Sequence, residues 1–145
     1  TAGDVDIQKR GVEVRRVARH RLADLFLDNI PVNAHTTASD ALWAGLPVLT
    51  ILGDTFVGRV AASLLHAVGL PELIAESPEA YEQMAVDLAT DPSRLAALKA
   101  RLAANRPTAP LFDTKRFTRH IEAAYTAMYR RHQAGLAPDH IDVPA

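Results

Sequence analysis

A polar stretch at residues 33–40, Asn-Ala-His-Thr-Thr-Ala-Ser-Asp, holds the side chains best suited to chemistry. It follows a short apolar run at 24–28 and leads into a predicted helix at 36–44. Ligands of open parallel sheets bind beyond the carboxyl ends of the strands, where a helix amino end offers free backbone N–H groups and a partial positive charge. Phosphate oxygens suit such a place. The stretch therefore indicates a phosphate or nucleotide site.

Four side chains of this stretch have possible roles at such a site. Thr36 and Thr37 can add hydroxyl donors, and His35 can donate a ring N–H to a phosphate or to a leaving oxygen. Asp40 lies one turn into the helix, and a carboxylate near a nucleotide is the expected partner of a ribose. A purely structural interpretation stays open, in which Thr36 caps the helix, Asp40 complements its dipole and His35 is a loop residue.

A second feature is a concentration of positive charge just before the polar stretch. The spacing of apolar residues predicts an amphipathic helix over 12–23, and residues 9–21 hold six of the sixteen Lys and Arg, although the net charge is -1. Guanidinium groups such as those of Arg16 and Arg19 can stack on a base or pair with phosphate. The alternatives are a solvated helix face and a nucleic-acid-binding helix, although the balanced charge predicts no general attraction to nucleic acid.

Several classes of site and location are disfavoured. The chain has no Cys, so it offers no thiol nucleophile or disulfide, which fits a reducing compartment such as the cytoplasm. Its six His show no metal-ligand spacing, and no serine lies in a nucleophile elbow. The longest apolar stretch is too short and interrupted to span a bilayer, and residues 1–10 have no apolar core of a signal peptide. We therefore expect neither a metal nor a membrane partner.

Short apolar runs alternate with helical patterns along the chain. Strands alternating with helices indicate parallel pairing, and hence an α/β fold with a parallel sheet and flanking helices. Trp43 is expected to fill the core, and the last helix is expected to bury a stripe of Phe117, Ile121, Ala124, Tyr125 and Met128. Strands are predicted at 24–28, 47–52 and 72–75, and helices at 36–44, 56–68, 78–90, 92–105 and from Asp113 to about Gln133.

Three strands are fewer than a doubly wound domain usually has. We expect the rest of the sheet either upstream of Thr1, which stands where an initiator Met would be, or in another chain. In the absence of further strands, the free strand edges predict self-association. The expected organisation is a leader or upstream remnant at 1–11, one incomplete donor-nucleotide-binding lobe at 12–134, and a tail at 135–145.

Four segments of the chain carry a resemblance to a known family. Residues 35–50 read His-Thr-Thr-Ala-Ser-Asp-Ala-Leu-Trp-Ala-Gly-Leu-Pro-Val-Leu-Thr, and residues 53–63 read Gly-Asp-Thr-Phe-Val-Gly-Arg-Val-Ala-Ala-Ser. With Leu-Ala-Asp-Leu-Phe-Leu-Asp at 22–28 and Pro-Leu-Phe-Asp-Thr-Lys-Arg-Phe at 110–117, these segments resemble the O-linked N-acetylglucosamine transferase and SPINDLY family. The resemblance covers most of the chain. It implies a Rossmann-like carboxyl-terminal lobe of a GT-B glycosyltransferase.

The resemblance also implies roles for individual residues. His35, Thr36 and Thr37 match the motif that holds the donor diphosphate, Asp40 matches the ribose carboxylate, and Arg19 matches an arginine near the base. Arg16 stands where many members have a histidine against the base, which leaves the identity of the base open. The family lysine at the leaving phosphate and the histidine proposed near the acceptor belong upstream, so no catalytic residue is assigned.

The implied reaction is inverting transfer of a sugar, N-acetylglucosamine from UDP-GlcNAc, to Ser or Thr of a protein without a metal or other cofactor. An upstream catalytic lobe and tetratricopeptide repeats (TPR) are the implied partners in a full-length cytoplasmic protein, and the piece alone is expected to be inactive. Two alternatives stay open. One is protein O-fucosylation from GDP-fucose, as in SPINDLY-type members. The other is a noncatalytic interaction module that has lost donor binding.

Overall fold

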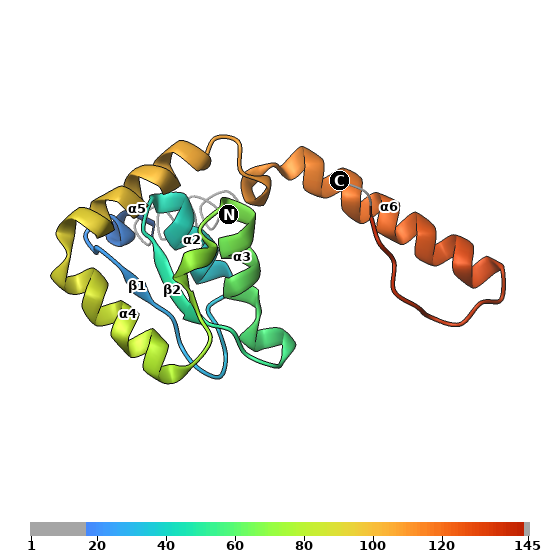
Figure 1. The fold of residues 1–145 in the computed structure, drawn as a ribbon. Helices are drawn as coiled ribbons and strands as arrows, with labels where there is room; N and C mark the ends of the chain where they lie inside the picture. Colours follow the sequence, from blue (N-terminus) through green and yellow to red (C-terminus); the bar gives the residue numbers. More distant parts are fainter. Residues whose placement is uncertain (1–16, 144–145) are drawn as a thin grey trace, which may run out of the picture. The chain divides into compact units, whose positions relative to one another are not determined.

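The computed structural model describes residues 17–143. Its centre is a three-stranded parallel sheet in which the middle strand pairs with both others, in the order β1-β2-β3 (Figure 1). The predicted parallel α/β architecture is therefore present. The strands are β1 (Phe26–Leu27), β2 (Val48–Ile51) and β3 (Ile74–Ala75).

Two crossover helices connect the strands. Helix α2 (Thr36–Ala44) lies between β1 and β2, and α3 (Val60–Val68) lies between β2 and β3. Each ends at a glycine in the left-handed region, Gly45 with φ 87° and Gly69 with φ 73°, a conformation that costs other residues free energy. Helices α2 and α3 pack against each other and against β2. These glycines fix where each crossover helix stops and the chain enters the next part of the sheet.

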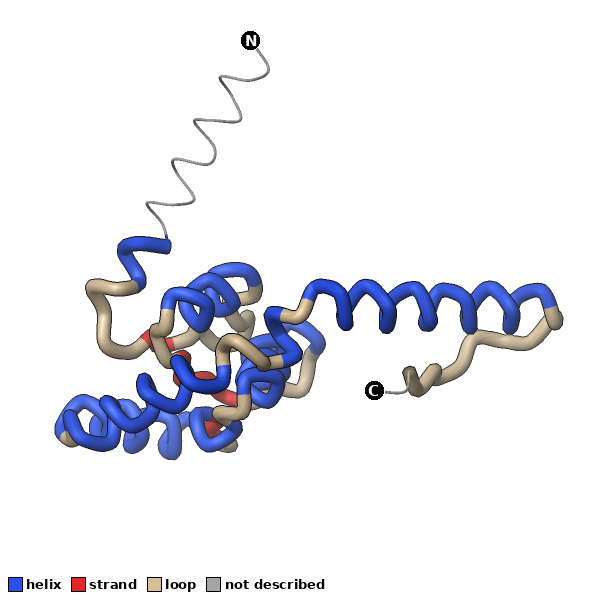
Figure 2. The backbone as a smooth tube through the Cα atoms, turned by 90° about the horizontal axis from the view of Figure 1, so that it is seen from above, coloured by secondary structure: helices blue, strands red, loops and turns tan. Residues whose placement is uncertain are grey.

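Two further helices follow β3. Helix α4 (Pro78–Thr90) begins after Ser77, whose hydroxyl accepts from the Ala80 N–H, and α5 (Pro92–Asn105) begins after Asp91, whose carboxylate accepts from the Ser93 and Arg94 N–H groups. Both starts combine an N-cap with proline at the first helical position, as predicted. Figures 1 and 2 show the sheet between two groups of helices, with α2 and α3 on one face and α4 on the other.

The core is built around β2. All four of its residues are buried, which agrees with its nearly continuous aliphatic sequence. Helices α2, α3 and α4 contact it, and the largest fully buried side chains include Leu42, Leu65, Leu88 and Leu102. Helices therefore hold the sheet in place from both faces. This packing also fixes where the turns after the carboxyl ends of the strands begin.

Several predicted elements are shorter than expected. The strand predicted at 24–28 is reduced to β1, and the strand predicted at 72–75 is reduced to β3 because residues 71–73 form a 3-10 turn, η2 (Pro71–Leu73). The helix predicted at 56–68 begins with a separate 3-10 turn, η1 (Phe56–Gly58), before α3. Of the helix predicted at 12–23, residues 17–20 are helical and a turn follows, whereas 12–16 lie outside the described residues.

The chain divides into two units, Thr1–Pro107 and Thr108–Ala145. The second contains η3 (Pro110–Phe112) and the long helix α6 (Thr114–Gln133), which Asp113 caps through the Arg116 N–H. No residue of α6 is buried, and Phe117 is 65% exposed. The buried stripe expected on this helix is therefore not formed within its own unit.

Trp43 also differs from the expectation that it fills the core. Its side chain is 54% exposed on α2. The guanidinium of Arg106 lies 5.7 Å from the ring centroid, and its Nη1 donates to the Trp43 carbonyl at 2.7 Å. Trp43 thus supports a cation–π contact with the residue that follows α5.

Candidate functional site

The turn between β1 and α2 is folded around a buried carboxylate. Asp28 follows β1 directly and is 6% exposed. Its Oδ1 accepts from the backbone N–H of Ala34 at 2.7 Å and of Asn29 at 2.9 Å, and its Oδ2 accepts from the Thr50 hydroxyl at 2.6 Å. Burying a carboxylate is costly unless it is hydrogen-bonded, and these three donors meet that need. The path of the chain into α2 is therefore tied to both neighbouring strands.

A second turn, at the carboxyl end of β2, packs against the first. The Asn33 N–H donates to the Val57 carbonyl at 2.9 Å, and the Gly53 N–H donates to the Gly58 carbonyl at 2.8 Å. A Cβ on Gly53 would lie 2.9 Å from the Gly58 carbonyl oxygen, and a Cβ on Gly58 would lie 3.1 Å from the Pro31 carbonyl oxygen. Only glycine permits this approach without a shift of the backbone. The two turns therefore form one structure.

His35 lies where these turns meet the start of α2. It is the residue immediately before the helix, and its carbonyl accepts the Ser39 N–H at 3.1 Å. The ring makes an edge contact with Phe56, with centroids 6.2 Å apart, and its Nε2 lies 3.5 Å from the Val57 carbonyl oxygen. The ring is half-buried between the turns, while its backbone begins the helix.

No side chain caps the start of α2. Thr36 is the first helical residue, so the alternative that Thr36 is an N-cap was wrong. The first turn of the helix contains no acidic residue either, so Asp40 does not complement the dipole there. Thr36 and Thr37 are both exposed. The amino end of α2 thus presents hydroxyl groups and the positive end of the helix dipole to its surroundings, as an anion site requires.

The structure brings His35, Thr36 and Thr37 together at the carboxyl-end side of the sheet. They follow β1, and the turn that contacts them follows β2. Asp40 lies further along α2 and is partly buried. The topology therefore agrees with the predicted place of a phosphate site in an open parallel sheet.

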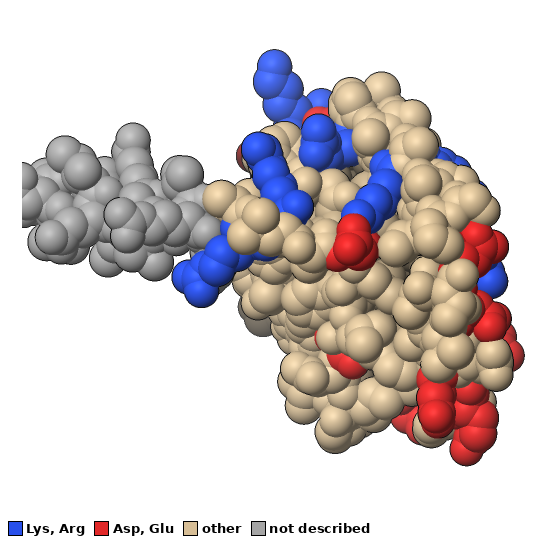
Figure 3. Space-filling model, turned by 90° about the vertical axis from the view of Figure 1, so that its left-hand side faces the viewer, with Lys and Arg blue, Asp and Glu red and all other residues tan. Residues whose placement is uncertain are grey.

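Of the two arginines expected near a base, Arg16 lies outside the described residues, so only Arg19 can be compared with the site. Arg19 is exposed and lines a hollow of about 460 Å³ with His20, Phe26 and Leu46. Since Leu46 follows the opposite end of α2, this hollow is separate from the His35–Thr37 turn. Figure 3 shows that Lys and Arg gather at one end of the face it views and Asp and Glu at another, so the near-neutral net charge is unevenly distributed.

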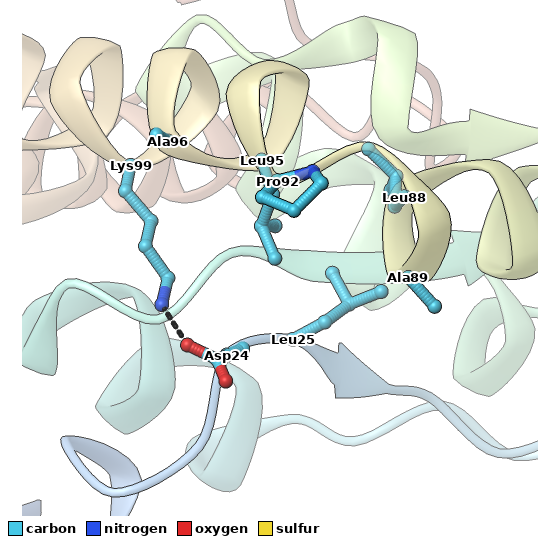
Figure 4. Close-up of a pocket in the computed structure, with 8 residues that line it drawn as sticks. All are labelled: Asp24, Leu25, Leu88, Ala89, Pro92, Leu95, Ala96 and Lys99. Carbon is cyan, nitrogen blue, oxygen red and sulfur yellow. Dashed lines mark hydrogen bonds and ion pairs between the residues drawn. The ribbon is translucent and has the colours of Figure 1, made fainter.

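Another hollow, of about 470 Å³, lies at the beginning of β1 (Figure 4). Leu25, Leu88, Ala89 and Leu95 are among the side chains that line it. The Lys99 ammonium, at its edge, is 2.6 Å from Asp24 Oδ1. Because that cation is paired and the lining is mainly apolar, the hollow has no free charge for a phosphate. It also lies before β1, whereas the turn at Asp28 lies after it.

Sequence reasoning missed the supporting residues of the site. The sequence indicated no role for Asp28, at the end of the apolar run 24–28, or for Thr50, within the strand predicted at 47–52. A signal was present, since a Thr within an aliphatic strand and a carboxylate directly after its neighbour are both polar groups that need partners when buried. Asn33, the first residue of the polar stretch, was given no role of its own, yet it is 5% exposed, and its Nδ2 lies 3.3 Å from the Asn29 carbonyl oxygen.

Tyr81 on α4 supports the same turn from another side. Its hydroxyl donates to the Asp28 carbonyl at 3.0 Å. Partial burial raises the pKa of the Tyr81 phenol above its ordinary value, and the negative charge of Asp28 raises that pKa further. The neutral phenol is therefore the form that the fold favours.

Residues 17–143 contain neither a group of metal ligands nor a membrane-spanning helix. Among them, no three His, Asp or Glu side chains are grouped as ligands for a metal ion. In the same part of the chain, no helix has the length and apolar character needed to cross a membrane.

Comparisons with known proteins place this site in a family. The model of glycosyl transferase family 41 matches residues 9–121. A UDP-N-acetylglucosamine–peptide N-acetylglucosaminyltransferase of Caenorhabditis elegans is 39% identical over 86% of the chain, and the SEC protein of Arabidopsis thaliana, named as a probable enzyme of the same activity, is 41% identical over 95%. The chain spans 14% of the length of the Arabidopsis protein and 11% of the nematode protein.

A solved structure of an O-GlcNAc transferase supports the same family. The K341M variant of the O-GlcNAc transferase of Thermobaculum terrenum matches 79% of the chain with a TM-score of 0.74 and 36% identity, and the chain covers 22% of it. This likeness supports the Rossmann-like lobe of a GT-B glycosyltransferase as the fold. The matched residues include both turns and the start of α2. The chain belongs to glycosyl transferase family 41.

Proposed function

We propose that this chain is the donor-binding lobe of an inverting protein O-glycosyltransferase that moves N-acetylglucosamine from UDP-GlcNAc to Ser or Thr. The observation that carries the proposal is the uncapped start of α2, with its exposed threonines, inside a region that matches family 41. The printed names of the relatives support the choice of sugar and nucleotide. Because the chain spans a small part of those relatives, the proposed activity belongs to the complete gene product.

The proposed role of the site is to stabilise the departing diphosphate. In a direct displacement at the anomeric carbon, negative charge grows on the leaving phosphate oxygen as the acceptor hydroxyl attacks. Backbone N–H groups at the start of α2 and the hydroxyls of Thr36 and Thr37 are donors held in place before the reaction. Asp40 is proposed to hold the ribose, and Arg16 and Arg19 to lie near the base. The mechanism needs no metal, because N–H and O–H donors supply the electrophilic assistance.

The identity of the base has an alternative. A relative from Oryza sativa, named as a probable UDP-N-acetylglucosamine–peptide N-acetylglucosaminyltransferase SPINDLY, is 38% identical over 82% of the chain. Its printed name supports UDP-GlcNAc, whereas Arg16, which stands in place of the histidine that the family resemblance implies, leaves GDP-fucose as the second candidate donor. A noncatalytic module is the remaining candidate, which predicts no nucleotide binding at all.

Calorimetric titration of the complete gene product with UDP and with GDP separates the three candidates. Saturable binding of UDP with little binding of GDP is the result that we expect. Preference for GDP would replace the proposed donor with GDP-fucose. Failure of both nucleotides to bind would contradict the glycosyltransferase proposal and favour the noncatalytic module.

A further inference from the structure

The hydrogen bonds of the Asp28 carboxylate reach both the turn before α2 and the middle strand of the sheet. Two backbone N–H groups of the turn and the hydroxyl of Thr50 all donate to its carboxylate, at 2.6–2.9 Å. Thr50 is fully buried on the middle strand. The carboxylate therefore connects the end of one strand, the turn and the interior of the next strand.

The contact with Ala34 transmits this connection to α2. Ala34 directly precedes His35, and the His35 carbonyl accepts the helical N–H of Ser39. One residue earlier, the Asn33 N–H is bound to the Val57 carbonyl. Because α2 has no side-chain cap, these upstream contacts replace a local cap in fixing where the helix begins and how its first turn is directed.

Asp28 has two opposite effects on the binding of an anion at the start of α2. A carboxylate just before an anion site repels a phosphate, so the charge alone weakens binding. A carboxylate that fixes the helix start holds N–H donors in position before the ligand arrives, which strengthens binding. Removal of Asp28 improves anion affinity if repulsion dominates and impairs it if positioning dominates.

We propose that Asp28, held by Thr50, is a positioning residue that directs the amino end of α2 at the donor diphosphate. The inference rests on the proposed function, because it needs a diphosphate at that helix end. Asp28 itself is not placed in contact with the substrate. It acts through Ala34 and His35, and Thr50 acts through Asp28.

The test compares binding of a nucleoside diphosphate with that of the corresponding monophosphate by the complete gene product. UDP and UMP serve if the protein prefers UDP, and GDP and GMP serve otherwise. The Kd of the monophosphate divided by the Kd of the diphosphate measures what the second phosphate contributes to binding. We expect Asp28→Ala to reduce this ratio by about tenfold or more, since misplacement of a positioning group by about 1 Å costs about 100-fold in rate. Asp28→Asn keeps both Oδ1 contacts available and is expected to retain most of the ratio.

Thr50 supplies a matched pair of variants. Thr50→Val removes the hydroxyl from Asp28 and is expected to reduce the ratio several-fold, whereas Thr50→Ser keeps the hydroxyl and is expected to restore it. Asp91→Ala controls for stability, because it removes the cap of α5, a helix for which the described structure gives no hydrogen bond to the turn. It is expected to lower the Tm without changing the ratio. If Asp28→Ala does not fold, the Thr50 pair decides the question.

The outcomes distinguish this inference from the proposed function. An unchanged ratio in Asp28→Ala or in Thr50→Val overturns the inference, and so does an increased ratio, which would show that repulsion dominates. An equal loss in Asp91→Ala overturns it as well, because general destabilisation would then explain the effect. Absence of nucleotide binding by the unmodified protein overturns the proposed function, and the inference with it.

Discussion

Thr37 offers the most direct residue-scale prediction. Its side chain is exposed in the first turn of α2, and no side chain caps that helix. In the complete gene product, Thr37→Ala is expected to lower the rate of sugar transfer by about 100-fold or more if the hydroxyl donates to the developing charge, by analogy with loss of one oxyanion donor. Initial rates measure the effect, and a thermal melt should show an unchanged Tm.

Thr126→Ala is the matched control for that variant. Thr126 is an exposed helical threonine of α6, and its hydroxyl donates to the Glu122 carbonyl at 2.8 Å. Loss of the same hydroxyl at this position should leave the transfer rate unchanged. Wild-type rates in Thr37→Ala would show that its hydroxyl has no part in the reaction.

Tyr81 gives a prediction for the pH dependence of stability. Because burial and the charge of Asp28 raise the pKa of its phenol in the folded state, the folded protein holds this proton more tightly than the unfolded chain. The associated stability is present below the ordinary tyrosine pKa of about 10 and is lost as pH rises through the higher folded value. Tyr81→Phe should therefore lose less stability than the unmodified protein as the pH rises above about 10. Urea unfolding across this pH range measures the free energy of unfolding of both proteins. If that free energy changes equally with pH in both, Tyr81 does not have a raised pKa in the folded state.

At the scale of single residues, the sequence showed which functional side chains are neighbours along the chain. It did not show which distant residues contact one another in the fold. His35, Thr36 and Thr37 are adjacent in the chain, so their common place at a helix start could be predicted. The partners of Asp28 come from residues 1, 6 and 22 positions away, and the sequence does not show which strand register brings Thr50 to it. Trp43 was expected in the core because aromatic side chains are often buried, whereas its side chain is 54% exposed and the Arg106 guanidinium lies over the ring.

At the scale of elements, the paired turns depend on the close approach of two glycines. Gly53→Ala places a Cβ 2.9 Å from the Gly58 carbonyl oxygen, so the turn must shift. We expect a loss of about 1–3 kcal/mol in the free energy of unfolding, the usual cost of overpacking. Chemical denaturation measures it, with Asp54→Ala as a control at the neighbouring exposed position. Equal stability of the two variants would show that the turns are not closely packed.

The start of α4 is an independent test of an element. Ser77 accepts from the Ala80 N–H at 3.1 Å. Ser77→Ala should therefore cost about 0.5–2 kcal/mol of stability, the usual contribution of an N-cap. Ser63→Ala, an exposed position within α3, is the control and should change stability little. A stability loss no larger than that of the control would show that the cap contributes nothing.

Helices were predicted more accurately than strands for a physical reason. Caps, first-turn prolines and terminal glycines are local signals, and they located α2, α4 and α5 well. Strand ends depend on which residues of a neighbour are available to pair, so β1 and β3 are shorter than the apolar runs that contain them. The amphipathic pattern of α6 correctly predicted a helix, but periodicity alone does not show what, if anything, covers its apolar side.

At the scale of the whole molecule, the sheet has an exposed edge. β1 pairs only with β2 in the described structure, and Leu27 on this strand is 53% exposed. Unpaired strand edges favour association with other strands. The 145-residue chain by itself is therefore expected to self-associate with rising concentration, as sedimentation measurements would show.

A charge on the edge strand should oppose that association. Leu27→Lys is expected to shift the chain toward monomer, whereas Val86→Lys, on the exposed side of α4, should leave association unchanged. A monodisperse monomer of the unmodified chain at all concentrations would contradict the expectation of edge pairing.

The account of the molecule as a donor-binding lobe is tested most directly by a structure of the complete gene product crystallised with UDP or GDP. The account predicts the diphosphate within hydrogen-bonding distance of backbone N–H groups in the first turn of α2, with the Thr37 hydroxyl beside it. A nucleotide bound with its diphosphate away from α2 would contradict it.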